Sequence, residues 1–270
     1  MVVESTSCLA ILPQPPDTGS TFDYVGGVTS RVPEPDDRIE RALVVAAHPD
    51  DVDFGAGGTV AAWTEAGVAV TYCVVTDGQA GGFDPDLDRA NMPEIRRQEQ
   101  RNAGKEVGVD DVRFLGYVDG ELYVTRHLIR DIVRVIRRVR PQRVLIQSPE
   151  RNWDRLAPSH PDHLAAGEAA TQAVYPGAGN PFAFTELLED GLDAWSPSEL
   201  WIMEHPQSNH AVDVTEHMDA KLSALACHQS QHPDPELIRT MMRSKLTATA
   251  VEFDLPEGCL AEKFAVYPVP

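Results

Sequence analysis

Short apolar runs alternate with longer helical patterns from Arg41 onward, and this alternation limits the fold more than any other feature. The first run, Ala42-Leu43-Val44-Val45-Ala46-Ala47, contains no polar residue. Continuously apolar strands are typical of a parallel sheet whose two faces are covered by helices. We expect strands at 42–47, 68–75, 112–116, 143–148 and 199–204, and helices at 56–66, 94–107, 126–139, 161–174, 215–230 and 234–247. The sequence therefore predicts a single α/β domain with a Rossmann-like, mostly parallel sheet, helices on both faces and an added edge strand within 248–267.

The first 38 residues differ in composition from the rest of the chain. They are rich in Pro, Gly, Ser and Asp, and the string Pro13-Gln14-Pro15-Pro16 disfavours regular structure. We therefore divide the chain into a Pro-rich N-terminal arm, residues 1–38, and one domain, residues 39–270. The arm could pack on the domain or on a neighbouring subunit, so a homo-oligomer is one assembly that the sequence allows.

The charge of the chain excludes some classes of partner. With 42 acidic and 23 basic residues the formal net charge is −19, which argues against binding to nucleic acid or to anionic membranes. No apolar run approaches the roughly 20 residues that span a bilayer, and residues 1–11 do not resemble a signal peptide. The four cysteines show neither metal-ligand spacing nor a disulfide framework. We expect a cytoplasmic protein without a transmembrane segment.

The sequence His48-Pro49-Asp50-Asp51 places one imidazole and two carboxylates directly after the first predicted strand. Ligands of open α/β sheets bind beyond the carboxyl ends of the strands, which is where these side chains would lie. Helix capping would explain the two carboxylates, but it does not explain the histidine. The glycines that follow, within 55–58, favour a sharp turn into the next helix. Their spacing differs from the fingerprint of a nucleotide-binding turn.

A second cluster, His160-Pro161-Asp162-His163, follows the strand predicted at 143–148. Histidines three residues apart share one face of a helix, so both could point into one cleft. The preceding loop, 149–158, is polar and carries Trp153, an aromatic residue that could stack on a sugar ring. Taken alone, the cluster is better explained as two histidines on an exposed turn.

Together the two clusters contain the donors of a catalytic zinc site. Zinc accepts imidazole nitrogens and carboxylate oxygens, and its catalytic sites use three protein ligands and leave one position open. His48, Asp51 and His163 would supply those ligands. Asp50 and His160 would then remain as acid–base groups, which is the division of labour that metal-assisted hydrolysis needs.

The two motifs resemble those of the LmbE-like, or PIG-L, family of zinc N-deacetylases. This family includes deacetylases of glucosaminyl-phosphatidylinositol, of the mycothiol pathway, of diacetylchitobiose and of glycopeptide antibiotics. The resemblance runs from about Arg41 to Phe264. Weaker matches are Thr76-Asp77-Gly78, Arg96-Arg97-Gln98-Glu99, Asp119-Gly120-Glu121-Leu122, His228-Gln229-Ser230-Gln231 and Glu262-Lys263-Phe264.

The resemblance implies zinc held by His48, Asp51 and His163, with Asp50 as the general base and His160 stabilising the oxyanion. It implies removal of an N-acetyl group from a small-molecule conjugate of N-acetylglucosamine.

The remaining residues are assigned to the surroundings of the zinc site. We expect Asp162 to orient His160 by accepting its ring N–H. Arg96 and Asp119 match substrate-binding positions of the family. His228 is expected near the cleft through its motif, and Trp153 is expected to bind substrate through its loop.

Two alternative functions stay open. The same site could cleave a larger amide of a glucosaminyl conjugate, as mycothiol-conjugate amidases do. The second alternative is a non-catalytic module that binds a sugar or a nucleotide. The absence of the glycine fingerprint of nucleotide-binding turns counts against this alternative. Apart from His228, we interpret the C-terminal histidines as surface or packing residues, because no second carboxylate–histidine constellation stands out. They are His205, His210, His217 and His232.

Overall fold

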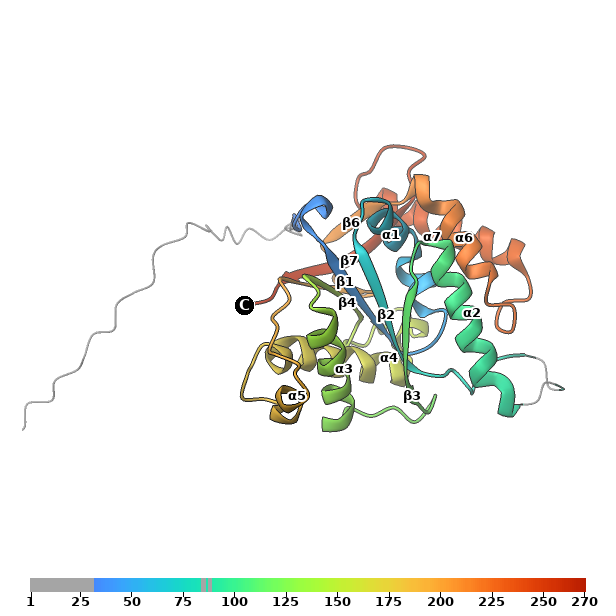
Figure 1. The fold of residues 1–270 in the computed structure, drawn as a ribbon. Helices are drawn as coiled ribbons and strands as arrows, with labels where there is room; N and C mark the ends of the chain where they lie inside the picture. The colour runs from blue at the N-terminus through green and yellow to red at the C-terminus, as the bar shows by residue number, and fades with distance from the viewer. Residues whose placement is uncertain (1–31, 84–85, 87–88) are drawn as a thin grey trace, which may run out of the picture.

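The computed structural model describes residues 32–83, 86 and 89–270. In this part of the chain seven strands form one sheet in the order β3-β2-β1-β4-β5-β7-β6 (Figure 1). The parallel strands are β1 (Arg41–Ala46), β2 (Ala69–Thr76), β3 (Asp111–Tyr117), β4 (Arg143–Gln147) and β5 (Glu199–Met203). The antiparallel strands are β7 (Ala261–Pro268), which pairs with β5, and β6 (His210–Asp213), which pairs with β7. The predicted α/β fold with a mostly parallel sheet is confirmed.

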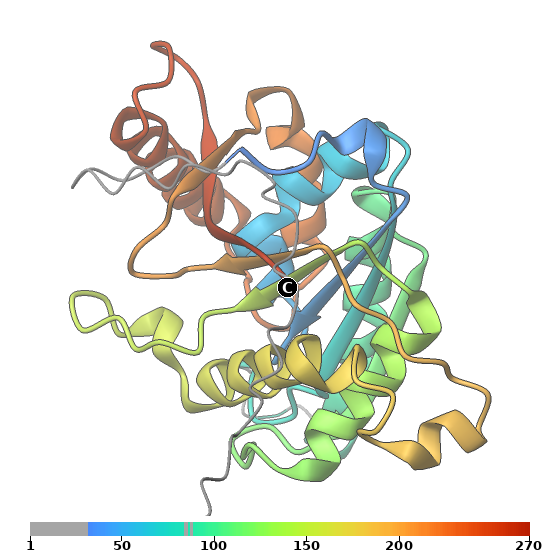
Figure 2. The ribbon, with the colours of Figure 1, turned by 90° about the vertical axis from the view of Figure 1, so that its left-hand side faces the viewer.

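Helices cover both faces of the sheet (Figures 1 and 2). One face carries α1 (Asp51–Glu65), α2 (Met92–Glu106) and α6 (Met218–Ala226), with α7 (Pro235–Glu252) packed beyond α6. The other face carries α3 (Arg126–Val139), α4 (Pro161–Gln172) and the short α5 (Thr185–Glu189). The side chains of β1 divide between two cores, because Leu43 and Val45 join one cluster while Val44 joins the other. This explains why the strand carries no polar residue.

The glycine cluster after β1 lies inside α1, so the turn expected at 55–58 was wrong and the helix begins five residues before the predicted 56. These glycines serve close packing of the helix. A Cβ atom on Gly55 would lie 2.5 Å from Met203 Sδ, and one on Gly58 would lie 2.7 Å from Val214 Cβ. A larger residue at Gly58 would push α1 away from Val214, and one at Gly55 would require the end of the Met203 side chain to move.

The C-terminal third differs most from the prediction. The helix expected at 215–230 is reduced to α6, and α7 continues past 247 to Glu252. The strand expected within 248–267 exists as β7, but it lies between β5 and β6 instead of at the edge. The edge strand β6 has only 4 residues and was not predicted. None of the helices in the described ranges is long and apolar enough to cross a bilayer.

The described end of the predicted arm packs against the domain. Arg143 donates to Glu34 O at 2.8 Å and to Asp36 Oδ1 at 2.7 Å. Its guanidinium lies over the rings of Trp63 and Trp201, 4.8 and 4.5 Å from their centroids. Residues 34–36 are therefore fixed to the domain, while residues 1–31 of the arm lie outside the described residues. The division at residue 38 stays a prediction.

Candidate active site

The loop after β1 is held in an unusual backbone conformation. Asp50 has a φ of 90°, in the left-handed region that residues with a side chain rarely adopt. Its backbone N–H donates to Gln100 Oε1 at 2.7 Å, and the N–H of His48 donates to Asp51 Oδ2 at 2.7 Å. These hydrogen bonds hold the strained turn. As a result, the Asp50 carboxylate faces Arg96 and His232, whereas the adjacent Asp51 carboxylate faces His48 and His163.

The two motifs meet beyond the carboxyl ends of β1 and β4. His163 Nε2 lies 3.0 Å from Asp51 Oδ1, and His48 Nδ1 lies 3.2 Å from Asp51 Oδ2. The two facing ring nitrogens, His48 Nδ1 and His163 Nε2, are 3.2 Å apart. Three side chains separated in sequence by as many as 115 positions therefore bring two imidazole nitrogens and one carboxylate together.

In both His48 and His163, the ring nitrogen that points away from Asp51 also has a hydrogen-bond partner. His48 Nε2 lies 3.2 Å from Asp119 Oδ1 and 3.3 Å from Asp162 Oδ2. His163 Nδ1 lies 3.1 Å from Pro158 O, an acceptor only, so Nδ1 carries the proton and Nε2 is free to bind a metal. The carboxylates likewise fix the proton of neutral His48 on Nε2, which leaves Nδ1 as a ligand atom.

The expectation that Asp162 orients His160 by accepting its ring N–H was wrong. The Asp162 carboxylate faces His48 and accepts from the backbone N–H groups of Gly120 at 2.7 Å and Leu122 at 3.3 Å. It is the backbone N–H of Asp162 that donates to His160 Nδ1, at 3.2 Å. Asp162 lies in the first turn of α4, where its carboxylate faces His48 while its backbone N–H donates to the His160 ring.

Charges at the centre favour a bound cation. Burial lowers the pKa of His48, but the field of Asp51 and hydrogen bonds to Asp119, Asp162 and Asp51 outweigh it and raise that pKa to about 12. Burial also lowers the pKa of His163, but the charge of Asp51 and hydrogen bonds to Asp51 and Pro158 together raise that pKa above its usual value. Burial raises the pKa of Asp51, but His163 and His48 hold it well below its usual value. Three carboxylates around two imidazoles thus attract one more positive charge.

The donor set fits a metal ion. Donor atoms of a tetrahedral site with bonds of about 2.1 Å lie about 3.4 Å apart, close to the 3.0 to 3.2 Å between His48, Asp51 and His163. Two further sets have ligand atoms within 4.8 Å of one another: His48 with His160 and His163, and His48 with Asp119 and Asp162. Three combinations of residues around His48 could therefore hold a metal ion.

The two predicted acid–base residues flank this cluster. Asp50 Oδ2 lies 3.1 Å from Arg96 Nη2 and 3.2 Å from His232 Nε2. The exposed His160 ring has its centroid 5.0 Å from that of His48. Burial, together with the charges of His48 and His163, lowers the pKa of His160.

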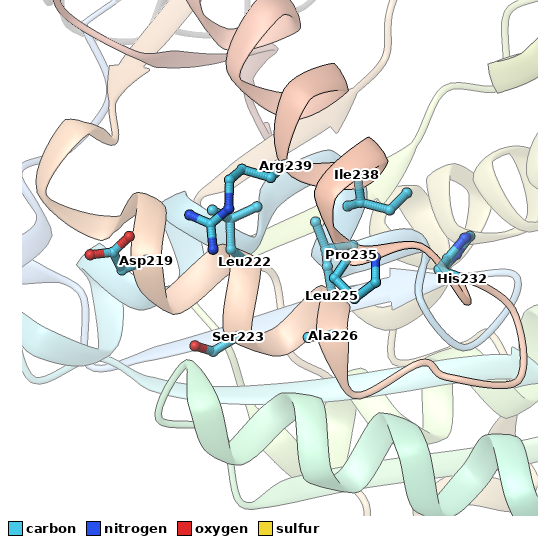
Figure 3. Close-up of a pocket in the computed structure, with 9 residues that line it drawn as sticks. All are labelled: Asp219, Leu222, Ser223, Leu225, Ala226, His232, Pro235, Ile238 and Arg239. Carbon is cyan, nitrogen blue, oxygen red and sulfur yellow. The ribbon is translucent and has the colours of Figure 1, made fainter.

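His232 is a site residue that we had interpreted as a surface or packing residue. Its ring packs edge-on against Phe54, with the centroids 4.8 Å apart, and its Nε2 reaches Asp50. It also borders a cavity of about 300 Å³ between α6 and the start of α7 (Figure 3). The sequence feature that could have identified His232 is its position directly after the recognised motif that runs from His228 to Gln231.

Two predicted substrate residues are buried. His228 is fully buried, and its Nε2 lies 2.8 Å from Asp53 Oδ2 beneath α1. Arg96 is 4% exposed and donates to Gly78 O at 2.9 Å and Pro49 O at 2.5 Å. Arg96 therefore supports the loop after β1 and His228 supports the first turn of α1, and both side chains are buried from a substrate.

The other two substrate candidates lie on the loops that follow β3 and β4. Asp119 reaches His48 through Oδ1 and accepts from the Ala80 N–H through Oδ2 at 3.1 Å. Trp153 is 79% exposed on the loop after β4, with the Arg151 guanidinium 5.6 Å from its ring centroid. Substrate contact by these two residues stays a prediction.

Comparison with known proteins agrees with the site. Residues 43–174 match the PIG-L family, described as GlcNAc-PI de-N-acetylase. The chain is 33% identical to the diacetylchitobiose deacetylase of Thermococcus kodakarensis over 205 residues, 76% of this chain and 74% of that protein. The chain belongs to the PIG-L family.

Two further relatives extend the comparison within the PIG-L family. A probable N-acetyl-alpha-D-glucosaminyl L-malate deacetylase 2 of Bacillus cereus is 33% identical over 70% of this chain and 82% of that protein. The N,N'-diacetylchitobiose deacetylase of Pyrococcus horikoshii superposes with a TM-score of 0.78 at 29% identity, covering 86% of this chain and 85% of that one. The named PIG-L relatives are deacetylases of N-acetylglucosamine compounds, which supports N-deacetylation.

Proposed function

We propose that this protein is a zinc-dependent hydrolase that removes the acetyl group from an N-acetylglucosaminyl conjugate. The convergence of His48, Asp51 and His163 within 3.2 Å of one another carries the proposal. We assign these three residues as zinc ligands, because the outer nitrogen of each histidine already has a hydrogen-bond acceptor. When bound, zinc would act as a Lewis acid and lower the pKa of a water molecule toward ~7.

We assign Asp50 as the general base. Its carboxylate lies beside the proposed ligands but bonds to Arg96 and His232 instead, so it is free of the metal and can take a proton from water. Arg96 and His232 hold the carboxylate in one orientation. A proton carried by Asp50 could then pass to the departing amine, which leaves acetate and a free amino sugar.

We assign His160 as a hydrogen-bond donor to the tetrahedral oxyanion. Its Nδ1 accepts the N–H of Asp162, so a neutral ring carries its proton on Nε2. That N–H is available to the substrate because the ring is exposed. A donor placed in advance where charge develops stabilises the transition state without reorganisation.

Asp50→Asn tests the proposal most simply. The amide keeps the shape of the side chain but cannot take a proton, so we expect kcat for acetate release to fall by about 10²–10⁴-fold while zinc content stays at one equivalent. Asp110→Asn, an exposed residue before β3, is the matched control. Near-normal turnover of Asp50→Asn would exclude this carboxylate as the base.

The amidase alternative uses the same residues on a larger amide. An N-acetylglucosaminide and a cysteinyl amide of the same amino sugar, assayed side by side, separate the two. We expect faster hydrolysis of the acetamide, in line with the deacetylases among the relatives.

A further inference from the structure

A cleft of about 280 Å³ leads away from the proposed zinc ligands Asp51 and His163. Much of its wall is apolar, formed by Phe54, Pro158, Met203, Met241 and Met242. An acetyl group is too small to fill this space, so the cleft is suited to another part of the substrate. Methionine side chains adapt to irregular apolar shapes, which suits a wall for an organic substituent.

The same cleft is lined by Arg155, Glu204 and Lys245. Glu204 accepts from Arg155 Nη1 at 3.1 Å and from Lys245 Nζ. These three residues also line a neighbouring cavity that Asp51 and His163 do not reach. They therefore stand at the end of the cleft away from the proposed metal.

This charged group has one positive charge in excess. Burial raises the pKa of Glu204, but Lys245 and Arg155 hold it below its usual value, so Glu204 is a single carboxylate facing two cations. Arg155 has five N–H donors and Lys245 has three, of which Glu204 occupies one each. The Arg155 side chain is 54% exposed, which leaves its other donors accessible.

The group is assembled from three distant parts of the chain. Arg155 belongs to the loop after β4, Glu204 follows β5, and Lys245 lies on α7. Glu204 has a φ of 57°, in the left-handed region that disfavours residues with a side chain. Two cations converge on the cleft although the chain as a whole carries a net charge of −19.

We propose that this cleft binds the substituent attached to the amino sugar and selects one that has an apolar body and ends in a carboxylate or phosphate. The apolar body contacts Met203 and Met241, and the anion reaches Lys245 and Arg155, which determine specificity. Charge-assisted hydrogen bonds to such an anion are stronger than neutral ones. The inference rests on the proposed function, because it takes the site beside Asp51 as the place of hydrolysis.

The test uses three benzyl N-acetylglucosaminides that differ only at the para position: carboxylate, phosphate or the neutral carboxamide. We expect the wild-type KM to be at least ~10-fold lower for an anionic probe than for the carboxamide. In Lys245→Met that ratio should fall toward one. Whichever anion gives the lower KM identifies the source of the negative charge.

Two further variants guard against a purely structural effect of Lys245. Arg155→Met, on an exposed loop, should lower the same ratio without a change in fold. Lys245→Glu should turn the preference toward a para-aminomethyl probe, which a loss of packing would not do. Lys105→Met, on the exposed face of α2, is the matched control and should keep the wild-type ratio.

Wild-type protein that releases acetate from all three probes with equal KM would overturn the inference and leave the proposed function intact. Failure to release acetate from any glucosaminide would overturn the proposed function instead. Calorimetric binding of the deacetylated probes then decides the inference by itself. Tighter binding of the anionic amines, lost in Lys245→Met, would support it, and equal or undetectable binding would contradict it.

Discussion

The two sides of the active site are built in different ways. On the strand side, His48, Asp51 and His163 follow β1 or begin α4, and hydrogen bonds from neighbouring loops hold their side chains. On the helical side, His232 and Lys245 come from the segment between α6 and the end of α7. The proposed metal centre therefore depends on short motifs at strand ends, whereas the surroundings of Asp50 and the proposed substrate cleft depend on packing between distant helices.

The largest expected effect is on the strand side. His163→Asn removes the Nε2 atom that lies 3.0 Å from Asp51 Oδ1. We expect bound zinc, measured by elemental analysis, to fall from one equivalent to near zero, and acetate release to fall to background. His217→Asn, at a histidine paired with Glu65 outside the site, should change neither. A His163→Asn protein with a full equivalent of zinc would contradict the ligand assignment.

A smaller effect on zinc binding is expected at Asp162, which contacts the proposed ligand His48. Asp162→Asn keeps the size of the side chain but removes the charge that faces His48 Nε2 at 3.3 Å. We expect zinc affinity, measured by competition with a chromophoric chelator, to fall by about 10–100-fold. Activity should return at high zinc concentration. If affinity is unchanged while activity is lost, Asp162 acts on the substrate instead.

On the helical side, His232→Gln should separate catalysis from metal binding. The ring nitrogen 3.2 Å from Asp50 Oδ2 orients the proposed base. We expect kcat to fall by about tenfold, with KM and zinc affinity close to wild type. His127→Gln, an exposed change on α3, serves as the control. A loss of zinc from His232→Gln would remove the distinction between the two sides.

The smallest effect concerns His228 beneath α1. Burial lowers the pKa of His228, but the hydrogen bond to Asp53 and its charge raise it above the ordinary value of 6.5. The charged pair therefore stabilises the fold fully below pH 6.5 and loses this effect as the pH rises through the raised pKa.

Chemical denaturation of His228→Gln should thus show a stability deficit of about 1–3 kcal/mol at pH 6 that shrinks at higher pH. Zinc content at pH 6 should match wild type. A deficit that grows with pH would reverse the assigned direction of the shift.

The strand side could be predicted from the sequence because its residues are tied to local patterns. An apolar run fixed the position of β1, and the polar residues after it lie at the carboxyl end of the sheet, where those after β4 also lie. The position of Asp162 could not be obtained in this way. Its carboxylate turns toward His48, 114 positions away in sequence, and this direction depends on how α4 meets β1.

The helical side was mispredicted for a physical reason. His228 and His232 stand one helical turn apart in spacing, yet α6 ends at Ala226, so the two rings point to different places. His228 enters the core beneath α1, and His232 reaches Asp50 from the loop. Arg96 was expected at the substrate, but carbonyl groups of two loops surround its guanidinium. Such contacts arise from packing that no local pattern reports.

Release of labelled acetate tests the central claim most directly. Zinc-loaded protein is mixed with an N-[1-¹³C]acetylglucosaminide and followed by NMR, beside a chelator-treated sample. We expect free acetate and an equal amount of free amino sugar, formed only in the zinc-loaded sample and recovered when zinc is returned. Equal acetate release with and without zinc, or none from any N-acetylglucosaminide, would contradict a zinc-dependent deacetylase.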